Sequence, residues 1–258
     1  RDHAAATAQV GAAAGALRRD GGAPANNAML LALDTSTRFA SIALYDAHGV
    51  QGEHTWRVEQ NHTEDLMPRV VALATAARVA PTALRGVAVA LGPGSFNGLR
   101  VAMSVAKGLA LGLGVPLVGF STLETLAYQH GSLSLPVRPI LEGGGRELAT
   151  ALYKVVRNHW TQIEEPHLAT VDDICAATTQ RTLLCGEISG DLAAELHQRL
   201  DQCIIAPPAA NARRAGYLAE LGWLSIADGR ADDPATLQPL YLRRPHITAS
   251  KKSTAARQ

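Results

Sequence analysis

Four polar residues that follow the first apolar run are the earliest candidates for chemistry. Asp34, Thr35, Ser36 and Thr37 come directly after the apolar residues of MLLALD, at positions 29–34. Backbone amides and hydroxyls in such a turn can bind phosphate, and an aspartate can hold Mg²⁺ through water. An ordinary polar hairpin turn has the same composition, so both interpretations stay open here.

A glycine-rich turn, GPGSFNG at residues 92–98, forms the second candidate. Glycine allows a tight turn and close backbone approach, Ser95 or Asn97 can cap the helix that follows, and a helix N-terminus attracts anions. The spacing matches neither a Walker A loop nor GxGxxG, and a purely structural turn fits equally well. The candidate phosphate or nucleotide contacts of the two turns are Asp34, Thr35, Ser36, Gly92, Gly94 and Ser95.

A third candidate pairs His62 with Glu64, which raises a metalloprotease hypothesis. Neither HExxH nor HxxxH fits, because Leu66 occupies the fourth position after His62, so the metal ligands are incomplete. We favour a helix start, with Asn61 or Thr63 as the cap and Glu64 in the first turn. We therefore predict no metal site and no catalytic residue.

Alternating apolar runs and helical patterns must position these residues, and they indicate an α/β fold with a mixed sheet. Each half of the chain has an approximate βββαβα order, which suggests a duplicated plan with two lobes. The predicted strands are 29–34, 39–46, 50–56, 86–91, 115–120, 136–141, 148–156, 159–163, 182–185 and 203–206. The predicted helices are 61–79, 99–113, one from Ser121, 171–177, 191–200 and 209–221.

Two of these helices are apolar on more than one side. The helix 99–113 has a narrow polar stripe of Arg100, Ser104 and Lys107, and the helix 61–79 is similarly rich in apolar residues. A helix of this kind is buried on several sides. Either both helices are enclosed in one domain, or their surplus apolar face binds another protein.

Composition excludes several classes of function. The 258 residues are 47% hydrophobic with a formal net charge of +1, which argues against a dedicated nucleic-acid binder. The cysteines Cys175, Cys185 and Cys203 form no CxxC pair, and we expect free thiols in the core in a reducing compartment. No apolar run is long enough to span a membrane.

The ends of the chain differ in composition from its centre. We expect an Ala/Gly-rich tail at 1–28, a first lobe at 29–130, a second lobe at 131–242 and a basic tail at 243–258. The last predicted helix belongs to the second lobe in sequence, with the option of packing back on the first.

Four segments together resemble the TsaB family: LALDTSTRFASIALYD, NHTEDLMPRV, GPGSFNGLRVAMSVAKGLALGLGVPLVGFSTLETLA and PLYLR. The resemblance is specific from residue 29 to about 128 and returns at 240–243. It implies a duplicated actin/hexokinase-like (ASKHA, ribonuclease H-like) fold with two βββαβα lobes. It also implies a non-catalytic cytoplasmic subunit that supports TsaD in forming the threonylcarbamoyl group on adenosine 37 of ANN-decoding tRNAs.

The resemblance further implies the partners and their contacts. We expect a TsaD-like subunit and a TsaE-like ATPase as partners, a homodimer in isolation, and tRNA contact only through the complex. ATP and Mg²⁺ are expected on TsaD and TsaE, with no cofactor in the isolated chain. The partner contacts carried over from the family are Leu66, Met67, Val70, Val71, Leu99, Ala102, Met103 and Ala106.

Two segments depart from the family pattern. Asn97 stands where the family usually has threonine, and residues 142–148 read EGGGREL in place of a D-x-R-x-x-E-V-Y-like segment. The second departure bears on any cleft function borrowed from the family. An active ATP-dependent transferase or kinase of the same fold, using Asp34 and the glycine-rich turn, is the alternative function.

Overall fold

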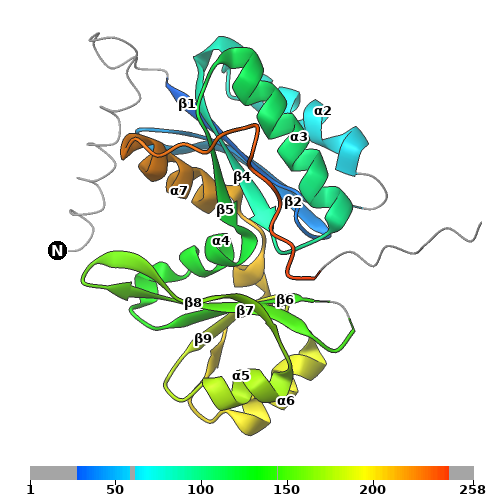
Figure 1. The fold of residues 1–258 in the computed structure, drawn as a ribbon, viewed down its shortest axis with the longest axis vertical. Helices are drawn as coiled ribbons and strands as arrows, with labels where there is room; N and C mark the ends of the chain where they lie inside the picture. Colours follow the sequence, from blue (N-terminus) through cyan, green and yellow to red (C-terminus); the bar gives the residue numbers. More distant parts are fainter. Residues whose placement is uncertain (1–27, 59–61, 144, 244–258) are drawn as a thin grey trace, which may run out of the picture.

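The computed structural model describes residues 28–58, 62–143 and 145–243 (Figure 1). The tails predicted at 1–28 and 243–258 therefore lie outside the described residues, except for Ala28 and Arg243. The side chains of His62, Thr63 and Glu64 also lie outside, so the helix-start and metal hypotheses at that point stay predictions.

Two five-stranded mixed sheets form the molecule, and they share one topology. The first sheet has the order β3-β2-β1-β4-β5, and the second, β10-β9-β6-β7-β8, repeats that order when it is read from β8. The first sheet and its crossover helices comprise β1 Met29–Asp34, β2 Phe39–Asp46, β3 Gly49–Arg57, α2 His62–Ala76, β4 Leu84–Gly92, α3 Phe96–Leu113 and β5 Leu117–Ser121. The second set comprises β6 Val137–Glu142, β7 Leu148–Val156, β8 His159–Ala169, α5 Val171–Ala177, β9 Leu183–Gly186, α6 Gly190–Arg199 and β10 Ile204–Ile205. The duplicated actin/hexokinase-like plan is thus confirmed.

The first sheet is covered on both faces, and the sequence of β1 reflects this. Leu31 and Leu33 face a cluster formed with α2 and α3, whereas Leu30 and Ala32 face a cluster formed with α7 Ala215–Ala227. A strand buried on both faces is continuously apolar rather than alternating. The helix α7 follows the second sheet in sequence but packs on the first (Figure 1).

The second sheet is also sandwiched. The helix α4 Thr122–Tyr128 covers the face toward the first sheet, and α5 and α6 cover the other (Figure 1). Ser121 caps α4 as predicted, because its hydroxyl accepts a hydrogen bond from the Leu123 amide at 3.2 Å. The three cysteines are free, but only Cys185 is buried, and Cys175 and Cys203 are partly exposed.

Several predicted boundaries were wrong. The helix expected to reach residue 79 ends at Ala76, and Arg78 has a φ of 55°, in the left-handed region. The strand expected at 159–163 extends to Ala169 as the partner of β7. The helix expected at 209–221 spans Ala215–Ala227 instead, and the consecutive prolines Pro207 and Pro208 favour a short 3₁₀ turn before it.

The C-terminal segment after α7 connects the two halves. The Leu240 amide donates to the Leu91 carbonyl at 2.7 Å, which ties this segment to the first sheet. Leu242 packs on the hydrophobic cluster between α4 and the second sheet, and Arg243 forms an ion pair with Glu147. The PLYLR segment therefore contacts both halves of the molecule.

Candidate functional site

The two polar turns singled out from the sequence lie next to each other. The strands β1 and β4 are parallel neighbours, so their carboxyl ends, Asp34 and Gly92, meet at one edge of the first sheet. The Ser95 amide donates to the Ser36 carbonyl at 2.6 Å, and the Thr35 hydroxyl donates to the Gly98 carbonyl at 2.6 Å. The fold thus brings all six candidate phosphate contacts together.

These turns are bonded to each other rather than open to a ligand. Asp34, Thr35 and Ser36 are buried, with side chains no more than 1% exposed. The Asp34 Oδ1 atom accepts hydrogen bonds from the Ser36 amide at 2.9 Å and the Ser36 hydroxyl at 2.5 Å. A methyl group added at Gly94 would lie 2.1 Å from the Ser36 carbonyl oxygen, so glycine is required for this close approach.

Ser95 serves as the cap of α3, one of the two roles predicted for it. Its side chain accepts a hydrogen bond from the Gly98 amide at 3.3 Å, while Asn97 is exposed within the first turn. The helix ends at Gly114, whose φ of 63° is the left-handed conformation typical of a C-terminal glycine. The glycine-rich turn is accordingly a strand-to-helix connection with both ends of its helix capped.

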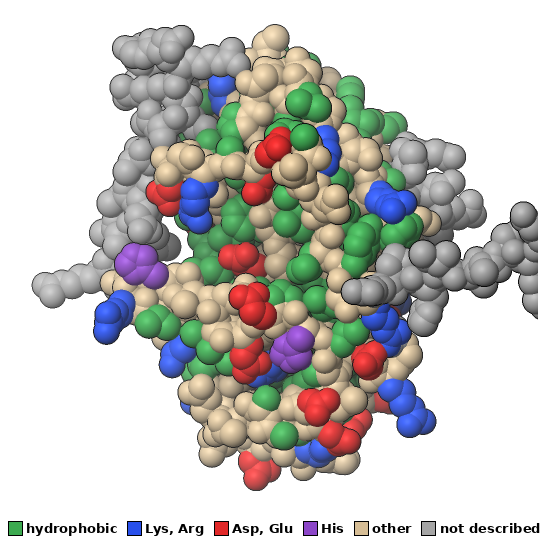
Figure 2. All heavy atoms as spheres, in the orientation of Figure 1, with side chains coloured by type: hydrophobic (Ala, Val, Ile, Leu, Met, Phe, Trp, Pro, Cys, Tyr) green, Lys and Arg blue, Asp and Glu red, His purple; other side chains and the backbone are tan. Residues whose placement is uncertain are grey.

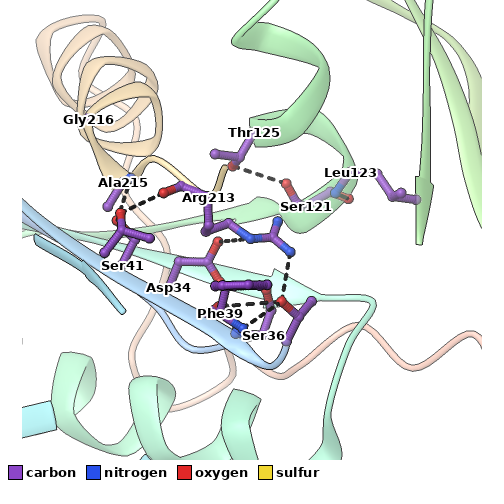
Figure 3. Close-up of polar contacts among 12 residues, drawn as sticks. Asp34, Ser36, Phe39, Ser41, Ser121, Leu123, Thr125, Arg213, Ala215 and Gly216 are labelled. Atoms are coloured by element: carbon purple, nitrogen blue, oxygen red, sulfur yellow. Dashed lines mark hydrogen bonds and ion pairs between the residues drawn. The ribbon is translucent and has the colours of Figure 1, made fainter. Parts of the chain in front are cut away.

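The sequence did not reveal Arg213, which completes this cluster. Its Nε atom lies 3.4 Å from Asp34 Oδ2, and its Nη2 atom donates to the Thr37 hydroxyl at 3.1 Å. The arginine side chain is 4% exposed and the aspartate is fully buried. Figure 3 shows the guanidinium directed at Asp34 from the segment that leads into α7.

The main chain around Arg213 is held on the first sheet. The Thr55 hydroxyl donates to the Arg213 carbonyl at 2.6 Å, and the Ala215 amide donates to the Ser41 hydroxyl at 3.0 Å (Figure 3). The predicted helix 209–221 placed Arg213 inside a helix, where its side chain has no defined partner. The only sequence feature that could have drawn attention to Arg213 is the pair Arg213-Arg214 directly before an apolar helix.

A cleft between the two sheets opens beside this cluster, with a cavity of about 550 Å³. Its lining comes from both halves of the molecule and includes Thr37, Arg57, Glu187 and Arg213. At the cleft, Arg38 of the first half pairs with Glu142 of the second at 3.0 Å. Glu142 belongs to the segment that departs from the family pattern.

The predicted partner contacts divide into two groups. Six of the eight are buried on the sides of α2 and α3 that face the sheet, so little of their surface is open to another protein, and their assignment to the interface stays a prediction. These six are Leu66, Val70, Leu99, Ala102, Met103 and Ala106. They face the sheet because a helix that covers a sheet buries its most apolar stripe there. Met67 and Val71 remain accessible, at 37% and 58% exposure.

The accessible outer side of these helices is nevertheless apolar. Leu111 on α3 is 70% exposed, and small residues surround it and Val71. We define the α2–α3 surface by its exposed residues Met67, Val71, Ala72, Gly108, Leu111 and Gly112. Figure 1 shows the two helices side by side, and Figure 2 shows apolar side chains at the surface on that side of the molecule. Such a surface suits close packing against another protein.

Two further properties bear on the site. Among the residues that the structure describes, no group of three or more His, Cys, Asp and Glu side chains comes together. Within the same described ranges, no helix is both long enough and apolar enough to cross a membrane.

Comparison with known proteins places these features in context. The family model described as TsaD, tRNA N6-adenosine threonylcarbamoyltransferase, matches residues 48–189. The TsaB protein of Bacillus subtilis (strain 168) is 35% identical over 125 residues, which are 48% of this chain and 55% of that protein. TsaB of Escherichia coli (strain K12) is 38% identical over 98 residues, or 38% of this chain and 42% of that protein. The chain thus spans about half the length of these curated relatives.

A solved structure extends the similarity to the whole fold. A Pseudomonas aeruginosa protein described as similar to the peptidase YeaZ superposes with a TM-score of 0.70 at 25% identity. The match covers 84% of this chain and all of that one. Sequence similarity reaches the same 84% of this chain in a Mycobacterium tuberculosis (strain ATCC 25618 / H37Rv) protein that is 28% identical over 221 residues.

Proposed function

The chain belongs to the TsaB group of the TsaD family, and from this premise we propose that it is a non-catalytic subunit in tRNA threonylcarbamoyladenosine biosynthesis. Its role is to bind a TsaD-like subunit, which carries out the transfer of the threonylcarbamoyl group to adenosine 37. A TsaE-like ATPase completes the set of partners, and the complex works in the cytoplasm.

The observation that carries this proposal is the α2–α3 surface. Val71 and Leu111 are 58% and 70% exposed on neighbouring helices. Gly108 and Gly112, which have no side chain, leave room for a partner helix to approach closely. Apart from Arg100, the exposed positions of α2 between 67 and 76 and of α3 are uncharged, and the charged side chains of Arg69 and Lys107 are half-buried. Depletion of charge is the feature that distinguishes the core of an interface from the rest of a protein surface.

Charge supports an indirect contact with tRNA. The formal net charge of the whole chain is only +1. Binding to a nucleic-acid backbone depends on many Lys and Arg contacts with phosphates. The chain therefore supports the complex chiefly through protein contacts, and tRNA is bound mainly by its partners.

The proposal is tested by light-scattering chromatography of the full chain alone and with a matching TsaD. We expect a homodimer in isolation, formed through the α2–α3 surface, and a one-to-one complex that replaces it on addition of TsaD. A chain whose measured mass does not change with TsaD would refute the subunit role. Calorimetry with Mg-ATP would then test the alternative of an active transferase or kinase.

A further inference from the structure

The buried carboxylate of Asp34 ends the central strand of the first sheet, at the edge where a bound nucleotide and its metal would need oxygen ligands. Mg²⁺ requires near-octahedral oxygen coordination at about 2.0–2.1 Å and normally keeps several of its waters. Asp34 is fully buried, and its Oδ1 atom is already bonded to the amide and hydroxyl of Ser36. The residues present therefore do not fit a metal-bound nucleotide.

We propose that Arg213 is a resident cation of the cleft, whose guanidinium holds the place beside Asp34 that a metal-bound phosphate would need. The inference rests on the proposed function in one respect, since a subunit without a catalytic centre of its own needs no nucleotide at Asp34. The arginine neutralises the buried carboxylate, bonds the turn through Thr37 and separates Asp34 from the cleft that the arginine lines.

Two nitrogen atoms of the guanidinium make contacts that support this assignment. The guanidinium spans the turn, with Nε 3.4 Å from Asp34 Oδ2 and Nη2 3.1 Å from the Thr37 hydroxyl. The Asp34 Oδ2 atom and the Arg213 Nη1 atom have no hydrogen-bond partner among the described residues. Their mutual attraction is thus the main compensation for burying two charges, and each depends on the other.

The main chain at Arg213 is fixed to the first sheet. Its carbonyl accepts from the Thr55 hydroxyl, and the amides of Ala215 and Gly216 donate to Ser41 and Glu53, all on the first sheet. The helix α7 that begins at Ala215 buries Leu218 and Trp223 on the same sheet. The fold therefore fixes the base of the arginine side chain, and the guanidinium itself is buried, with the side chain 4% exposed.

The test uses thermal unfolding with and without MnCl₂. It compares wild type with the single variants Arg213→Ser, Arg213→Lys, Arg213→Met and Asp34→Asn and with the double variants D34N/R213S and D34N/R213M. Removing one partner of a buried pair is strongly destabilising, so Arg213→Ser should lower Tm by about 10 °C. The serine also leaves space at Asp34, and Mn²⁺ at ten times its dissociation constant should restore about 3–6 °C. Wild type, Arg213→Lys and a D34N/R213S protein should not respond to Mn²⁺.

A matched control is available in the second half of the chain. Arg138 is 1% exposed and bonds both oxygens of Glu164 at 2.8 Å. Arg138→Ser should also lose stability, but Mn²⁺ should not restore it, because Glu164 is a third exposed and lies outside the cleft.

If Arg213→Ser does not fold, the unfolding temperature of the D34N/R213M protein still tests the inference. Replacing both members of a buried ion pair removes both desolvation costs, so this protein should unfold within a few degrees of wild type. A loss equal to the sum of the two single substitutions would overturn the proposal. Asp34-dependent binding of Mn²⁺ or Mg-ATP by wild type would overturn it as well, whereas failure to bind TsaD would count only against the proposed function.

Discussion

The guanidinium of Arg213 lies 3.4 Å from the carboxylate of Asp34, although Arg213 precedes α7 and Asp34 ends β1. The contact forms because α7 returns from the second sheet to cover the first. Both side chains are buried, so a polar cluster lies at the edge of the first sheet where β1 and β4 end.

Thr37→Val should destabilise the protein by about 1–3 kcal/mol. Valine keeps the shape of threonine but removes the oxygen that accepts from Arg213 Nη2, and a buried donor without a partner is costly. Chemical denaturation measures the change. The matched control is Thr75→Val on the exposed side of α2, which should stay within about 0.5 kcal/mol of wild type. Equal effects of the two substitutions would contradict the role given to Thr37.

Gly94→Ala and Gly108→Ala should change stability in opposite directions. A methyl group at Gly94 would meet the Ser36 carbonyl oxygen at 2.1 Å, so the two turns must separate, at a cost of about 1–3 kcal/mol. Nothing lies within 4 Å of a methyl group at Gly108 within α3, where alanine should stabilise by about 0.5–1 kcal/mol. Urea unfolding of both variants measures the two changes, and a stable Gly94→Ala protein would show that the turns are not tightly apposed.

Stability should fall as the pH rises from about 4.5 to about 7, through Glu124 on α4. Burial raises the pKa of this carboxyl from 4.5 to about 7, against the attraction of Arg230. Across this range the unfolded chain has lost the proton that the folded chain retains, so unfolding becomes easier with rising pH. Glu124→Gln should remove this slope, which amounts to about 3 kcal/mol. Denaturation curves at several pH values measure it, and parallel pH profiles for the two proteins would contradict the assignment.

Much of the fold follows from local sequence. The apolar run before Asp34, the glycine-rich turn and the caps Ser95 and Ser121 each lie where their residue types predict. These features depend on residues that are close in the chain, and so they can be predicted from the local sequence. The start of α7 was not predicted correctly, because a 3₁₀ turn at Pro208–Asn211 occupies its predicted first turn.

The contacts that form the site could be predicted from the sequence to a smaller extent than the fold. Periodicity marks Leu66 and Met67 as apolar but does not tell which of them the sheet covers, and the structure buries the first and exposes the second. Arg213 was missed because its partner Asp34 is remote in the chain and the pairing depends on where α7 packs. Contacts of this kind are set by tertiary structure and leave no local pattern.

The most direct test of the account is the affinity of a matching TsaD for the Val71→Glu and Ile163→Glu proteins, measured by titration calorimetry. Val71 and Ile163 are 58% and 49% exposed, so neither glutamate should disturb the core, whereas glutamate at buried Val70 or Met103 would test folding instead. Val71→Glu should weaken binding by about 30-fold or more, because it places a charge in the centre of the α2–α3 surface. Ile163→Glu on β8 should bind like wild type. Unchanged binding by a folded Val71→Glu protein would contradict docking through α2 and α3.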